Sequence, residues 1–151
     1  EYGGLEGHYS LIPISKQHFW SINCTAIIPA AIELQINKDN VDLLNTKVIV
    51  EGANGPVDTE VDDILNSKKI DVIPDILANS GGVLVSYYEY QQNSFNERWN
   101  IHDVRNKFKY DMKMAFDKVW LEHKNQQHMD LREASYSVAL NKLDSAFKKN
   151  N

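Results

Sequence analysis

Short apolar runs alternate with longer polar segments in the first half of this 151-residue chain. The runs cover residues 24–28, 47–51 and 69–73, and their starts lie about 22 residues apart. This spacing leaves room for a helix between successive runs, and strands joined by helical crossovers pair in parallel. The pattern therefore predicts an α/β fold with a partial parallel sheet.

The polar segments between the runs carry helical signals. Apolar side chains three or four positions apart occur within residues 38–44 and 60–65. Thr59 is predicted to cap the second of these helices. A proline lies soon after each apolar run, where it ends strand pairing and turns the chain; these prolines are Pro29, Pro56 and Pro74. They are expected to mark the carboxyl edge of the sheet.

Beyond the third run the pattern becomes helical. Residues 83–90 follow a pair of glycines and are predicted to form a helix, and the polar residues 91–100 are predicted to be a connection. Two further helices are predicted from capping-box pairs, Asn100 with Asp103 and Asp130 with Glu133. Each carries an apolar stripe. The stripes are Ile101, Val104, Phe108, Met112, Ala115 and Val119 in the first, and Tyr136, Leu140, Leu143 and Phe147 in the second.

Composition narrows the classes of function. An apolar content of 42% and a charged content of 25% are typical of a soluble globular domain. The net charge of -5 gives no excess of basic side chains for nucleic acid, and no apolar run approaches the ~20 residues that cross a membrane. Cys24 is the only cysteine, so a reducing compartment such as the cytoplasm is expected. The five histidines lack metal-ligand spacing, and no metal site is predicted.

Ligands of open parallel sheets bind beyond the carboxyl ends of the strands. Ala30 and Ala31 follow the first run, where small side chains admit a flat ring or a ribose, or simply pack a helix start. Asn54 lies between two glycines after the second run, in a segment that fits either close approach to a ligand or a plain turn. The residues alone leave these alternatives open.

The segment after the third run offers a second kind of candidate. Asn79 precedes a predicted helix on which Val83, Ser86 and Tyr90 share one face. A core stripe accounts for Val83 and Tyr90 but not for the serine between them. This face is therefore predicted to line a pocket.

Three segments at these strand exits closely resemble the glutamate dehydrogenases. They are residues 19–31 (FWSINCTAIIPAA), 50–56 (VEGANGP) and 74–83 (PDILANSGGV). The similarity continues through residues 85–89 and through 131–136 (LREASY), so it covers nearly everything after about Phe19. The first eighteen residues match the family poorly.

The resemblance implies a Rossmann-like three-layer α-β-α fold. Residues 1–92 would form the C-terminal half of the dinucleotide-binding domain, and residues 93–151 a helical segment that packs back on the enzyme. The implied activity is the reversible oxidative deamination of L-glutamate to 2-oxoglutarate and ammonia with NAD or NADP. The family also implies a homo-oligomer, commonly a hexamer, in which this chain is joined to the remainder of the enzyme.

The resemblance assigns roles to the candidates at the strand exits. The expected cofactor contacts are Ala30, Ala31, Asn54 and Asn79, with Asn79 near the nicotinamide amide. Val83 and Ser86 are expected to face the substrate, and the Ser86 hydroxyl to bind its distal carboxylate. Dehydrogenases of apolar amino acids usually lack the Val-Ser-Tyr continuation, so glutamate is preferred over leucine, phenylalanine or valine. A non-catalytic assembly unit is the alternative for the isolated chain.

The family's catalytic residues are not among these 151 residues. Its water-activating lysine, its proton-handling acid and its glycine-rich pyrophosphate turn belong to preceding segments, and the chain lacks an initiator methionine. The sequence is therefore expected to be a piece of a longer enzyme and to be inactive by itself. Thr25 and Ser80 stand where the family more often has aspartate and alanine.

Overall fold

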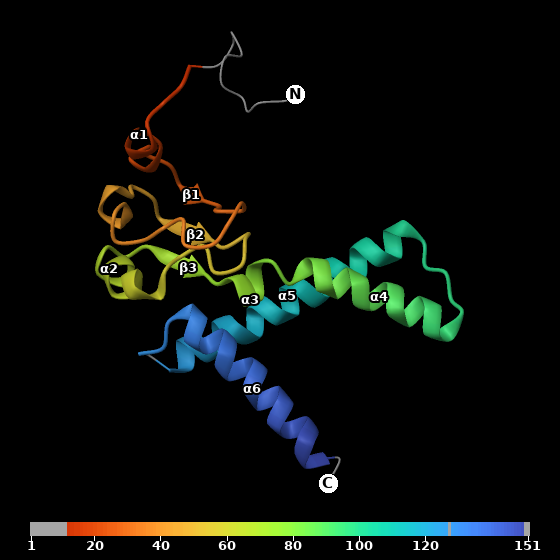
Figure 1. The fold of residues 1–151 in the computed structure, drawn as a ribbon. Coiled ribbons are helices and arrows are strands. Elements are labelled where there is room, and N and C mark those ends of the chain that lie inside the picture. Colours follow the sequence, from red (N-terminus) through yellow and green to blue (C-terminus); the bar gives the residue numbers. More distant parts are fainter. Residues whose placement is uncertain (1–11, 127, 150–151) are drawn as a thin grey trace.

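The computed structural model describes residues 12–126 and 128–149 and contains a parallel sheet on one side of the molecule (Figure 1). Its strands are β1 (Ala26–Ile27), β2 (Val48–Val50) and β3 (Asp71–Ile73), in the order β1-β2-β3. Both pairings are parallel. The predicted α/β class and strand positions are confirmed, although each strand is shorter than its apolar run.

Short helical turns precede, connect and follow the strands. They are α1 (Lys16–Trp20), η1 (Val41–Leu43), η2 (Thr59–Val61), α2 (Asp62–Ser67) and α3 (Asp75–Ala78). The helix predicted over residues 38–44 is only the single 3₁₀ turn η1. Thr59 as a cap was wrong: the Asp58 carboxylate accepts from Glu60 N at 3.0 Å, and aspartate is at least as good a capping residue as threonine.

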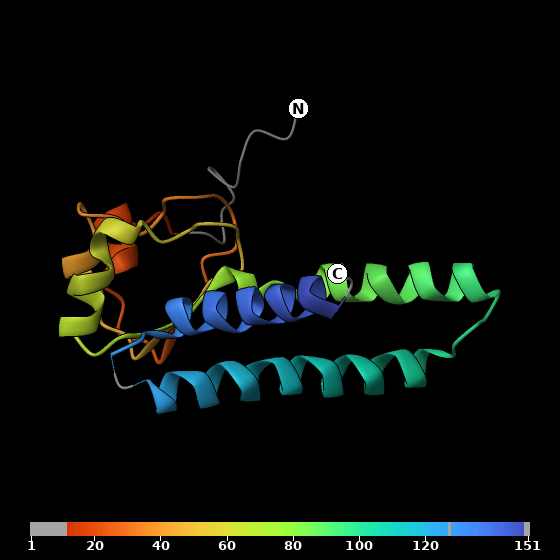
Figure 2. The same ribbon diagram turned by 90° about the horizontal axis from the view of Figure 1, so that it is seen from below.

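Three long helices extend away from the sheet. They are α4 (Gly81–Phe95), α5 (Ile101–Asn125) and α6 (Leu131–Lys149), and Figure 2 shows α5 as a separate layer beneath both α4 and α6. The predicted helix over 83–90 is confirmed. The connection predicted over 91–100 is too long, because α4 continues to Phe95 and ends at Asn96 in the left-handed conformation. The division proposed at residue 92 therefore falls inside a helix, and it stays a prediction.

Both predicted caps form. The Asn100 side chain accepts from His102 N at 2.9 Å and from Asp103 N at 3.0 Å. In the second cap, Asp130 N donates to Glu133 Oε2 at 3.1 Å and Glu133 N donates to Asp130 Oδ1 at 2.8 Å. This reciprocal pair is a capping box. Among residues 12–126 and 128–149, no helix is long and apolar enough to cross a membrane.

Two apolar clusters lie on opposite faces of β3. The crossover cluster consists of Ile36, Val41, Leu44, Ile49, Val57, Val61, Leu65 and Ile70. The helical cluster consists of Leu77, Val119, Leu131 and Ala134. Val72 packs against the first cluster and its neighbour Ile73 against the second, because successive side chains of a strand point to opposite faces. At β3 the sheet therefore lies between two helical layers, as predicted.

The two apolar stripes have different outcomes. In α5, Val119 is buried and Val104, Phe108, Met112 and Ala115 are half-buried, whereas Ile101 is exposed. In α6 the predicted stripe is exposed: Tyr136 by 50%, Leu140 by 61%, Leu143 by 56% and Phe147 by 69%. The buried face of α6 is instead Leu131, Ala134 and Ser135. The α6 stripe is thus not part of this chain's own core.

A buried tyrosine joins α4 to α5. Tyr88 is 1% exposed, and its hydroxyl donates to Asp111 Oδ2 at 2.5 Å. Burial raises the pKa of Tyr88, and the hydrogen bond to Asp111 adds to this effect. The same hydrogen bond lowers the pKa of the Asp111 carboxyl, helped by Lys107 and opposed by burial. The ionised carboxylate therefore stabilises the packing of these helices.

We expect Asp111→Asn to lower the free energy of unfolding at neutral pH. A carboxyl whose pKa is depressed by folding contributes stability above its unfolded pKa of about 3.9, and this contribution is lost as the pH falls through the folded value. The gap to wild type should therefore close below about pH 4. Urea unfolding across this pH range measures it. As a control, Asp117→Asn breaks only an exposed pair with Lys113 and should cost less than about 1 kcal/mol. A pH-independent gap would contradict the assignment.

Candidate functional site

The segments that follow the strands meet at the carboxyl edge of the sheet. Gly52 N and Ala53 N, after β2, both donate to Pro29 O, after β1, at 3.0 and 2.9 Å. A Cβ on residue 52 would lie 3.0 Å from the Ala30 Cβ. Such a contact is tighter than nine in ten Cβ contacts, so a side chain at position 52 would force Ala30 to shift by a few tenths of an ångström, and the close approach of the two loops favours glycine.

Two of the predicted site residues contact each other. Asn79 Nδ2 donates to Asn54 Oδ1 at 2.7 Å and to Ala53 O at 3.3 Å. Within residues 12–126 and 128–149, Asn54 Nδ2 and Asn79 Oδ1 have no hydrogen-bond partner. The pair therefore presents one free amide donor and one free carbonyl acceptor at the edge where parallel sheets bind ligands.

The remaining candidates are exposed. Ala30 and Ala31 line an apolar pocket beside the exit of β1, together with Phe19 and Trp20. On α4, Val83 is 71% exposed and Ser86 is exposed, with its hydroxyl donating to Gly82 O at 3.2 Å. Ser86 follows Asn79 by about two helical turns. The structure thus brings Asn54 and Asn79 together and leaves Val83 and Ser86 on an open helix face.

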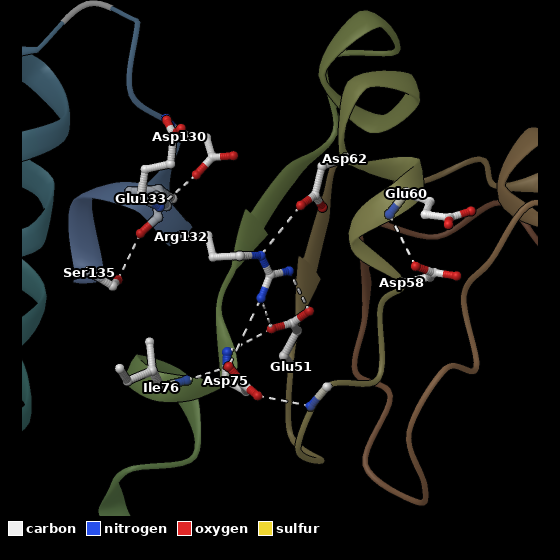
Figure 3. A network of polar contacts seen from close by, with 12 residues as sticks. Glu51, Asp58, Glu60, Asp62, Asp75, Ile76, Asp130, Arg132, Glu133 and Ser135 are labelled. Carbon is white, nitrogen blue, oxygen red and sulfur yellow. Dashed lines mark hydrogen bonds and ion pairs between the residues drawn. The ribbon is translucent and has the colours of Figure 1, made fainter. Parts of the chain in front are cut away.

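An ion pair buried beneath this edge was not predicted (Figure 3). Glu51, which ends the second apolar run, is 0% exposed. Arg132 of α6 donates to it through both terminal nitrogens, at 2.9 Å to Oε2 and 2.7 Å to Oε1. Asp75 N also donates to Glu51 Oε2 at 2.7 Å. The carboxylate therefore joins β2, α3 and α6.

The network extends to two further carboxylates. Asp75 Oδ2 accepts from Gly55 N at 2.8 Å, and Arg132 lies 4.0 Å from Asp75 Oδ1 and 3.6 Å from Asp62 Oδ2. Burial raises the pKa of Asp62, although Arg132 opposes this. Burial disfavours the Arg132 cation, but the hydrogen bond to Glu51 and the charges of Glu51, Asp62 and Asp75 together outweigh burial and raise the pKa of Arg132. Despite these acids, the described residues contain no group of three or more His, Cys, Asp or Glu placed to hold a metal ion.

Comparison with known proteins decides the family. The sequence model for Glutamate/Leucine/Phenylalanine/Valine dehydrogenase matches residues 4–150. The chain belongs to this family. The structure of the hetero-hexameric glutamate dehydrogenase from Thermus thermophilus, in its leucine-bound form, superposes with a TM-score of 0.86 at 26% identity, over 93% of this chain and 34% of that one. The predicted resemblance is confirmed, and the fold is the Rossmann-like α/β fold of the family. The prediction that the first eighteen residues match poorly was wrong, because the family match begins at residue 4.

Two relatives are named for different cofactors. The NAD-specific glutamate dehydrogenase of Clostridioides difficile is 35% identical over 98% of this chain and 35% of its own length. The NADP-specific glutamate dehydrogenase of Synechocystis is 41% identical over 88% of this chain and 31% of its own length. The chain thus spans about a third of the length of the relatives it matches.

Sequence reasoning missed the ion pair because its partners lie 81 positions apart. Both belong to segments that resemble the dehydrogenase family, but neither segment indicates that it contacts the other. The one available signal was Glu51 itself, a charged residue that ends an apolar run inside an α/β dehydrogenase fold. Charged side chains are rarely fully buried unless they are paired, so a buried strand end of this kind implies a partner elsewhere.

We expect Gly52→Val to push apart the loops after β1 and β2. The new side chain would collide with Ala30, and overpacking of this kind typically costs about 1–3 kcal/mol. The free energy of unfolding in urea measures the loss. Gly82→Ala is the matched control, because a Cβ at position 82 meets nothing within 4 Å and alanine suits a helix. Equal stability of the two variants would rule out the close contact.

Proposed function

We propose that this chain is the C-terminal third of an NAD(P)-dependent glutamate dehydrogenase, which converts L-glutamate to 2-oxoglutarate and ammonia reversibly. The proposal rests on family membership together with one observation: the Asn54–Asn79 pair lies at the carboxyl edge of the sheet with a donor and an acceptor free. Ligands of such sheets bind at this edge.

The residues at the edge suit a nicotinamide dinucleotide. A carboxamide carries an NH2 group that donates and a carbonyl oxygen that accepts, which complement the free groups of Asn54 and Asn79. Ala30 and Ala31 expose only methyl groups, so a ring or ribose can lie against the backbone after β1. When bound, NAD or NADP accepts the hydride removed from glutamate. The similarity of the chain to both NAD-specific and NADP-specific relatives supports either cofactor.

We assign the substrate to the exposed face of α4. Ser86 would turn its hydroxyl from Gly82 O toward the distal carboxylate of glutamate, and Val83 would cover the aliphatic part of the substrate. A hydroxyl donor distinguishes a carboxylate from an apolar side chain, which supports glutamate over leucine, phenylalanine or valine. Recognition of the distal group is thus the contribution of this chain to specificity.

Other parts of the enzyme complete the site. The water-activating lysine, the proton-handling acid and the pyrophosphate turn come from segments outside these residues, so the chain itself supplies no catalytic residue. In this arrangement residues 1–92 are the second half of the dinucleotide-binding domain and residues 93–151 pack back on the enzyme. We further propose a homo-oligomer; the relative from Thermus thermophilus is hetero-hexameric, which supports assembly into an oligomer but not the identity of the subunits.

We expect Ser86→Ala in the full-length enzyme to raise the KM for glutamate about tenfold, because a hydrogen bond to a charged group contributes about 1.5–3 kcal/mol. The KM for the dinucleotide should stay unchanged. Steady-state kinetics give both constants. The control is Ser94→Ala, which removes an exposed hydroxyl near the other end of α4. An unchanged KM for glutamate would show that Ser86 does not bind the substrate. Separately, if the wild-type enzyme turns over leucine or valine faster than glutamate, an apolar substrate is favoured.

The 151-residue chain alone should not deaminate glutamate. It holds the proposed cofactor and specificity residues, but the groups that activate water and move protons are supplied by the rest of the enzyme, and proximity of all of them is needed for turnover. Formation of reduced nicotinamide, followed by its absorbance, measures the activity. The full-length enzyme at equal concentration is the positive control. Turnover by the purified chain would refute this assignment.

A further inference from the structure

We propose that Arg132 is a positioning residue for the nicotinamide dinucleotide, acting from α6 through Glu51 and Asp75 on the loop that carries Asn54. This inference rests on the proposed function of that loop as a cofactor contact. Arg132 would not touch the cofactor itself. Its effect passes through hydrogen bonds that the structure shows one after another.

The first link fixes the end of β2. Glu51 is fully buried, and both of its oxygens accept from the Arg132 guanidinium. A two-pronged contact of this kind sets the orientation of the carboxylate as well as its position. Without the cation, a buried carboxylate would be left without charge compensation and would have to move toward water or take up a proton.

The second link carries this orientation to the loop. Glu51 Oε2 accepts from Asp75 N at 2.7 Å, which places the first residue of α3. The Asp75 carboxylate then accepts from Gly55 N at 2.8 Å and from Ile76 N at 2.7 Å. Asn54 lies between Glu51 and Gly55, so both sides of its loop are held by this one chain of contacts.

The surroundings make Arg132 hard to replace. Its side chain is 16% exposed and faces three carboxylates, those of Glu51, Asp62 and Asp75. Only two of the three lead to the loop, because Asp62 contacts Arg132 Nε but does not bond to residues 52–55. The structure therefore separates carboxylates that transmit the position of Arg132 from one that does not.

The test uses the full-length enzyme with three variants. Arg132→Lys keeps the charge but loses the planar fork, and Asp75→Ala breaks the bond to Gly55. Both should raise the Kd for reduced dinucleotide about tenfold, because a displaced loop would no longer hold Asn54 where it can hydrogen-bond the cofactor. The KM for glutamate should change less than about twofold. Asp62→Asn should leave dinucleotide binding unchanged. Equal Kd values for wild type and Arg132→Lys would overturn the proposal.

A general loss of stability must be told apart from positioning. Val119→Ala weakens the cluster under α6 without touching the network, so it should reduce thermal stability but not dinucleotide affinity. If Arg132→Lys fails to fold, the double variant Glu51→Gln with Arg132→Met removes both charges and keeps an acceptor for Asp75 N. That variant should fold and still bind dinucleotide weakly. Wild-type affinity in the double variant would overturn the proposal.

Amide hydrogen exchange tests the link between Arg132 and the loop that carries Asn54 without any ligand. Peptides covering residues 51–56 should exchange faster in Arg132→Lys and in Asp75→Ala than in wild type, Asp62→Asn or Val119→Ala. If the wild-type enzyme binds neither NAD nor NADP, the proposed function fails while the exchange data still decide whether Arg132 holds the loop. Unchanged exchange in Arg132→Lys would show that it does not.

Discussion

The buried carboxylate of Glu51 is the constraint on which this structure depends. A fully desolvated negative charge is tolerated only with a cation and further hydrogen bonds around it, and here Arg132 and Asp75 N provide them. Because Arg132 lies on α6, the end of β2 and the last helix cannot be placed independently of each other. Since Ile73 of β3 packs on the helical cluster beside them, apolar and ionic contacts fix the same arrangement of sheet and helix.

Most of the secondary structure could be predicted from local patterns in the sequence. The apolar runs located the three strands, and the capping pairs Asn100 with Asp103 and Asp130 with Glu133 located two helix starts. One error arose because two neighbouring residues could both act as a helix cap. Asp58, not Thr59, caps the 3₁₀ turn η2 before α2. The end of α4 was also missed, because the polar residues 91–94 suit an exposed helix as well as a loop.

The candidate site was only partly visible in the sequence. Asn54 and Asn79 could be placed at one edge because parallel strands bring their exits together, and their contact follows from that topology. The pairing of Glu51 with Arg132 could not be predicted, since no periodicity links positions so far apart. The apolar stripe of α6 shows a related limit. Its spacing indicates that one face of the helix is apolar, but it does not indicate what covers that face, and the described residues leave it exposed.

The loop after β2 is held from three separate places in the sequence: the exit of β1, residues 75–79, and Arg132 through Glu51. A chimaera that exchanged only residues 51–56 between relatives would transfer the side chains without their supports. A crossover point anywhere between this loop and α6 would likewise pair a strand end from one parent with an arginine from the other. The loop is therefore a spatial unit, and a chimaera keeps its position only if matching residues are present at all three supports.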